Sequence, residues 1–134
     1  MHAITMESFL SFLAYFGSGA LVLLVGVFIV ALITPHKDFT LIREGNAAAA
    51  TAFAGTLIGI ALPLHSAISH SVSLLDAVIW GAVATVIQVV AYLAARTMSS
   101  RLSHQITDGV SAAGIFAAGV SISIGLINAA AMTP

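Results

Sequence analysis

The chain contains no cysteine, which excludes a disulfide framework, a thiol nucleophile and a thiolate metal site. Charge is almost as scarce: Lys, Arg, Asp and Glu make up 7% of 134 residues, against about a quarter in a soluble domain. The net charge of −1 gives no electrostatic footprint for nucleic acid. With 60% hydrophobic residues and a mean hydropathy of +1.11, the composition predicts a protein whose solvent is the lipid bilayer.

Residues that could support catalysis are also few. The sequence offers no nucleophile–base pair, no phosphate-binding loop and no cluster of metal ligands, so we expect neither enzymatic activity nor a cofactor. His70 follows His65 by five positions, which is not a recognised metal-ligand spacing. We interpret both histidines as polar residues of a joint between membrane spans.

Long apolar segments dominate what remains. A helix needs roughly 20 apolar residues to cross the hydrocarbon core, and backbone groups in lipid must pair within their own segment. The sequence therefore predicts an all-α membrane protein with one integral domain, 1–134, and an uncleaved first span that is too long for a signal peptide. The four expected transmembrane helices cover about 9–33, 46–64, 74–96 and 109–131.

The basic residues give an orientation. Lys37 and Arg43 lie in the first joint, Arg96 and Arg101 flank the third, and the middle joint contains no Lys or Arg. By the positive-inside rule, the first and third joints are cytoplasmic. Both termini are then expected outside the cytoplasm.

A shift of 64 positions aligns the two halves of the chain without a gap. We interpret this as a tandem duplication, with repeat one at about 9–64 and repeat two at about 73–131. Each half holds two spans, so we expect a parallel orientation and a pseudo-twofold axis along the membrane normal. Matched pairs include Gly17 with Gly81, Val22 with Val86, Glu44 with Asp108, Gly45 with Gly109, and Gly55 with Gly119.

Small residues mark the expected packing face of the second and fourth helices. Their spacing of three, four or seven keeps one helix face toward a neighbour, and small side chains let backbones approach closely. We expect these two helices to form the central contact, and interpret a second small stripe on the fourth helix, from Ser111 through Gly114, Ala118, Ser121 and Gly125 to Asn128, as an oligomer contact. The predicted helix-packing residues are Gly45, Ala48, Gly55 and Gly59, with Gly109, Ala112, Gly119 and Ser123 as their counterparts.

Acidic residues occupy matching positions before the second and fourth helices. Glu44 and Asp108 complement the positive helix ends in one interpretation, with Asn46 and Asp108 as capping residues. In the other interpretation they form an acidic pair that attracts a cation at a cytoplasmic vestibule.

Polar residues at depth need partners. Gln88 in the third helix and Asn128 in the fourth either hydrogen-bond a neighbouring helix or line a pore. Ser73 and Asp76 have the capping-box spacing at the start of the third helix. Pro63 is expected to end or kink the second helix.

Three blocks of this sequence resemble a known family: "REGNAAAATAFAGTLIGIALPL", "SVSLLDAVIWGAVATVIQVVAY" and "GVSAAGIFAAGVSISIGLINAAAM". They are similar to the YjfL-like bacterial inner-membrane proteins, a domain of unknown function (DUF350). The resemblance implies a small multi-span protein of the bacterial inner membrane with a duplicated helix pair, in a family often encoded beside membrane-stress or polyamine-related proteins. The second copy departs from the pattern, because "TDGV" stands where the first has "REGN".

Two functions of different classes stay open. The first is a self-assembling structural component associated with envelope stress, with the bilayer, other copies of itself, and a peripheral or integral membrane protein as partners. The alternative is an oligomeric ion or small-solute channel or transporter. In that case Glu44, Asn46, Gln88, Asp108 and Asn128 line the path.

Overall fold

The protein is a helical bundle, seen in a computed structural model that describes residues 5–34, 38–70, 73–98 and 101–132. Lys37 lies outside these residues, and so does the side chain of Arg96. Four described helices are long and apolar enough to cross a membrane, which confirms the predicted fold class at that level. The helices are α1 (Met6–Ile33), α2 (Asp38–Arg43), α3 (Ala47–His70), α4 (Leu74–Met98), α5 (Leu102–Thr107) and α6 (Ser111–Met132).

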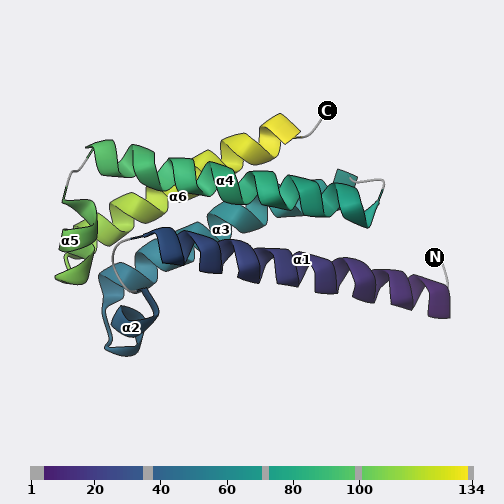
Figure 1. Cartoon of the computed structure of the whole chain (residues 1–134), viewed down its shortest axis with the longest axis horizontal. Coiled ribbons are helices and arrows are strands. Elements are labelled where there is room, and N and C mark those ends of the chain that lie inside the picture. Colours follow the sequence, from purple (N-terminus) through teal and green to yellow (C-terminus); the bar gives the residue numbers. More distant parts are fainter. Residues whose placement is uncertain (1–4, 35–37, 71–72, 99–100, 133–134) are drawn as a thin grey trace.

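The long helices form two layers (Figure 1). α1 and α4 lie side by side and run in the same direction, while α3 and α6 lie behind them and run the opposite way. The short helices α2 and α5 lie at one end of the bundle, whereas α1 begins and α6 ends toward the other. The most extensive contact between two helices joins α3 to α6, so the prediction that the second and fourth spans pack together is confirmed.

The second span is longer than expected. The structure continues α3 through Pro63 to His70. The predictions that Pro63 ends the helix and that a joint begins at residue 65 are therefore wrong. Proline removes one intrahelical hydrogen bond and frees the carbonyl four residues earlier. That carbonyl belongs to Gly59 and has a partner on another helix, as described below.

The turns that lead into α3 and α6 have the same backbone geometry. Glu44, Gly45 and Asn46 donate their amides to carbonyls of α2, and matching bonds recur 64 residues later between α5 and α6. Gly45 has φ 84° and Gly109 has φ 78°, a left-handed conformation that glycine adopts without strain. A Cβ on either glycine would meet nothing within 4 Å. Both glycines therefore serve turns, and their prediction as helix-packing residues is wrong.

The packing face of α6 also differs from the predicted one. Ala48, Gly55 and Gly59 of α3 are buried as expected, but Ala112, Gly119 and Ser123 of α6 are exposed. The stripe interpreted as an oligomer contact packs on α3 from Gly114 to Gly125, and Ser111 at its start is exposed. A Cβ on Gly114 would lie 2.3 Å from the Ala48 carbonyl oxygen, and one on Gly125 would lie 2.5 Å from that of Gly59. Glycine is needed at both positions because backbone meets backbone there.

This contact does not have the predicted twofold symmetry. A twofold axis brings equivalent positions of two helices together or exchanges them across the contact. Gly55 instead packs on Ala118, where a Cβ would lie 2.4 Å from the Ala118 Cα, while Gly119, the counterpart of Gly55, has nothing within 4 Å. The prediction of a pseudo-twofold is therefore wrong for the α3–α6 contact.

We predict that Gly45→Ala destabilises the protein by about 1 kcal/mol, because a side chain with a Cβ disfavours the left-handed conformation. Gly45→Asn should cost less, since asparagine enters that region more readily than alanine. Unfolding in detergent by a graded denaturant measures both values. Equal stability of the two variants would contradict the backbone explanation.

Candidate functional site

The Gln88 side chain lies at the centre of the bundle. It is 1% exposed, and its Nε2 donates to the Gly59 carbonyl of α3 at 3.1 Å and to the Ser121 carbonyl of α6 at 3.1 Å. The Gly59 carbonyl is the one freed by Pro63, which has no N–H to offer it. In a membrane such a group must find a protein partner. Gln88 therefore supplies from α4 the donor that the proline removes from α3.

The contact around Gln88 leaves no room for a larger neighbour. A Cβ on Gly59 would lie 2.6 Å from Nε2 of Gln88 and 2.6 Å from the Ser121 carbonyl oxygen. The other amide atom of Gln88, Oε1, is buried with no hydrogen-bond partner among the described residues. An unpaired acceptor at depth is costly. The polar group thus joins three helices with both donor hydrogens in use and its acceptor unpaired.

Asn128 lies farther along α6, toward the helix end. It is 9% exposed, and its Nδ2 has no hydrogen-bond partner within the described part of the chain. Nearby, the Ser66 hydroxyl donates to the Ala129 carbonyl at 3.2 Å, which adds a second polar contact between α3 and α6. Gln88 and Asn128 are both buried within the bundle.

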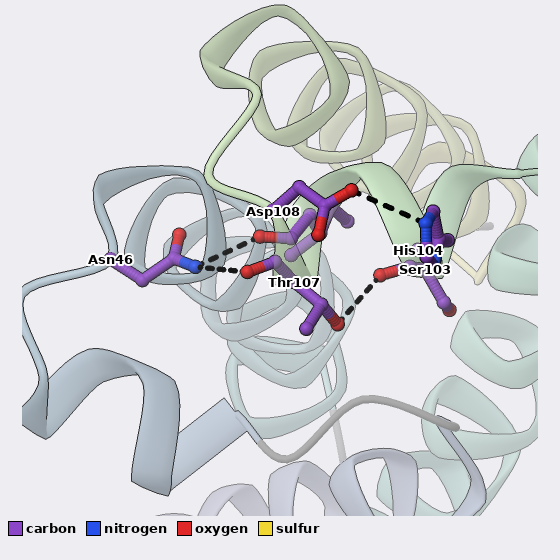
Figure 2. Close-up of polar contacts among 6 residues, drawn as sticks. Asn46, Ser103, His104, Thr107 and Asp108 are labelled. Carbon is purple, nitrogen blue, oxygen red and sulfur yellow. Dashed lines mark hydrogen bonds and ion pairs between the residues drawn. The ribbon is translucent and has the colours of Figure 1, made fainter.

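Asn46 joins the two turns at the other end of the bundle (Figure 2). Its Oδ1 accepts from the Ala49 amide at 2.9 Å, which confirms its predicted role as the N-cap of α3. Its Nδ2 donates to the carbonyls of Ile106 at 2.9 Å and Thr107 at 3.2 Å, at the end of α5. One side chain therefore starts a membrane helix and fixes α5 beside it.

The two acidic residues of the turns are exposed. Asp108 ends α5 and lies 3.3 Å from His104 Nε2, so it does not cap α6, and that prediction is wrong (Figure 2). The reason is that Gly109 and Val110 separate it from α6, which begins at Ser111. Glu44 is likewise exposed at its turn. Both carboxylates lie at the α2 and α5 end of the bundle.

Sequence reasoning missed Asp38, a buried carboxylate. It is 7% exposed and lines a cavity of about 30 Å³ with Thr34, Thr56, Tyr92 and Ser121 as the other polar residues. A volume of this size holds about one water molecule. One signal was present in the sequence: the residue 64 positions later is Leu102, an apolar residue that is 1% exposed.

Other predicted residues have simpler positions. Ser73 Oγ accepts from the Asp76 amide at 3.2 Å, as the capping-box spacing predicts. His65 and His70 lie on α3 and are exposed, and His70 Nδ1 lies 2.9 Å from the Ser66 carbonyl. Among the described residues, no group of three or more His, Asp or Glu could hold a metal ion.

Comparison with known proteins gives the family of this chain. Residues 4–132 match the family described as Domain of Unknown Function (DUF350). The chain belongs to the DUF350 family. No solved structure matches it.

Two named relatives of this DUF350 chain come from distant bacteria. It is 40% identical over 128 residues to the UPF0719 inner membrane protein YjfL of Escherichia coli K12, covering 96% of this chain and 97% of the relative. It is 28% identical over 119 residues to the UPF0719 transmembrane protein YshE of Bacillus subtilis, covering 87% and 89%. With four membrane-length helices, these relatives identify a multi-pass inner-membrane protein and confirm the family resemblance.

We predict that Gln88→Met destabilises the folded chain by about 1 kcal/mol, because two interhelical hydrogen bonds are lost. The cost should fall to roughly half in a Pro63→Ala background, where the restored amide can pair with the Gly59 carbonyl. Val86→Met, on the exposed side of α4, is the matched control and should be neutral. Equal effects of Gln88→Met in both backgrounds would contradict the link between the proline and the glutamine.

Proposed function

We propose that this protein is a self-assembling structural component of the bacterial inner membrane, without enzymatic activity and associated with envelope stress. The observation that carries the proposal is the use of two amide side chains, one at the centre of the bundle and one at its α2 and α5 end. Gln88 and Asn46 both donate to backbone carbonyls of neighbouring helices, as structural residues do. Meanwhile α6 presents small exposed residues, among them Ala112, Gly119 and Ser123, which suit a close helix contact.

The proposal includes a tandem duplication of a two-helix unit. Three features support it: α2 and α5 have equal length, their bounds differ by 64 residues, and both lead into a positive-φ glycine. It also places α2 and α5 in the cytoplasm and both termini outside. Arg43 and Arg101 support this orientation, because both belong to the α2 and α5 end of the chain.

The cytoplasmic turns offer a surface for a further partner. Glu44, His104 and Asp108 are exposed there, beside short helices that lie outside the long-helix layers. We propose that a peripheral or integral membrane protein binds at this end.

A reporter fused after Pro134 tests the orientation. We expect alkaline phosphatase at this position to be active, because that enzyme folds only outside the cytoplasm, whereas green fluorescent protein should stay dark. A fusion in the α2–α3 turn should give the reverse pattern. Fluorescence at the C-terminus would overturn the proposed topology.

The assembly state tests the function itself. The purified full chain, reconstituted in nanodiscs or held in mild detergent, should have a mass of more than two chains by light scattering. The detergent contribution is measured separately in the same run. A mass of one chain under both conditions would overturn the proposal of self-assembly.

The second candidate is an oligomeric channel or transporter, and the cavity at Asp38 favours it. A buried carboxylate that shares a space for one water with four hydroxyl side chains can hold a proton or small cation along such a path. Liposomes containing the same preparation discriminate the two functions. Proton or cation flux that is lost in Asp38→Asn supports the channel, and background flux in the native protein rejects it.

A further inference from the structure

The α3–α6 contact joins two different faces of corresponding helices. The buried face of α3 includes Ala48, Ala52 and Gly59, and that of α6 includes Gly114, Ala118 and Gly125. These α6 residues lie 66 positions after the three α3 residues, in the same order. The two halves of the sequence, by contrast, align at a shift of 64. Two residues correspond to about 200° around a helix, so the faces used are nearly opposite.

Such a head-to-tail contact leaves one copy of each face without a partner. In α6, the residues 64 positions after the buried α3 face include Ala112 and Gly119, and both are exposed. In α3, the residues 64 positions before the buried α6 face include Ala50 and Ala54, and both are also exposed. Each side of the chain therefore exposes a copy of one of the two faces that pack together inside it.

The outer layer also has a contact whose repeat counterparts are exposed. On α4, a Cβ on Gly81 would lie 2.4 Å from Val22 of α1. The counterpart of Gly81 is Gly17, which is exposed with nothing within 4 Å, and the counterpart of Val22 is Val86, which is 61% exposed. Gly17 therefore lies on an exposed face of α1, while Val86 lines the groove between α1 and α4.

We propose that a second copy of this chain covers these faces by continuing the internal interface. The α4/α6 edge of one copy, through Ala112 and Gly119 of α6, packs on the α1/α3 edge of the next, through Ala50 and Ala54 of α3. This heterologous contact repeats from copy to copy, giving a row that can close into a ring. The inference rests on the proposed self-assembly and adds its geometry.

The residues at the two edges fit this partner. Helices associate in lipid through close packing of small side chains, because apolar burial gains little there. Gly119 would face Ala54 of the next copy, as Gly55 faces Ala118 within the chain. An α6–α6 twofold contact would leave the α3 face open, so the two arrangements require different residues.

Bulky substitutions at each edge separate the arrangements. Gly119→Leu blocks the α4/α6 edge and Ala54→Leu blocks the α1/α3 edge; both sites are exposed, so the fold of one chain should be kept. Ala82→Leu is the matched control, because Ala82 is exposed in the groove between α1 and α4, away from both edges. The native chain and each variant are expressed alone. The two blocked variants are also co-expressed with different tags and purified through both tags. The mass of each preparation is then measured by light scattering.

We expect more than two chains for the native protein and for Ala82→Leu, but one chain for Gly119→Leu alone and for Ala54→Leu alone. Co-expression of the two blocked variants should restore a particle of two chains, through the one unblocked edge on each. Native-sized assembly of either variant, or a mixture that stays at one chain, would overturn the inference while the proposed self-assembly stands. A native protein of one chain would overturn both.

Disulfide trapping keeps the test decisive if a leucine variant fails to fold. The chain has no cysteine, so Ala50→Cys and Ala112→Cys introduce the only thiols. These positions correspond to Gly114 and Ala48, which touch within the chain. Oxidation of native membranes should give a dimer when the two variants are co-expressed and none with either variant alone. A dimer from Ala112→Cys alone would favour the twofold contact and reject the row.

Discussion

The structure depends on the direct approach of two helix backbones, α3 and α6. In lipid, burying apolar side chains against each other gains little, so van der Waals packing and interhelical hydrogen bonds must hold helices together. Gly55, Gly59, Gly114 and Gly125 make this possible, because a Cβ at any of them would lie within 2.6 Å of an atom across the contact. The helices α1 and α4 then cover one side of this pair as a second layer.

The proline in α3 shows how the bundle uses its few polar residues. Pro63 leaves the Gly59 carbonyl without its usual donor, and Gln88, 25 residues after Pro63, supplies one from α4. A lost local bond has thus become a bond between helices. From the sequence, both a helix contact and a pore were open for this glutamine, and in the structure its donors bond two neighbouring helices. In this chain, the hydrogen bonds of Gln88 are therefore explained together with the proline of the neighbouring helix.

Much of the architecture could be predicted from the sequence, because lipid allows few choices. Length and hydropathy fix the four membrane helices, and local spacing fixes the caps at Asn46 and Ser73. The face of α6 could not be predicted, since small residues lie on two sides of that helix and only the tertiary contact selects one. Asp38 was missed because its burial depends on α2 packing against α3 at the end of the bundle, which its local sequence does not show.

The polar residues that hold the two halves together occur once per chain. Gln88 has Leu24 as its counterpart, and Asn46 has Val110, so neither hydrogen-bonding side chain is available at the outer edges. In a row of copies, contacts with polar bonds would alternate with contacts made by packing alone. The joints between chains would then be the weaker ones. Such an assembly would come apart in whole chains and exchange subunits while each chain stays folded.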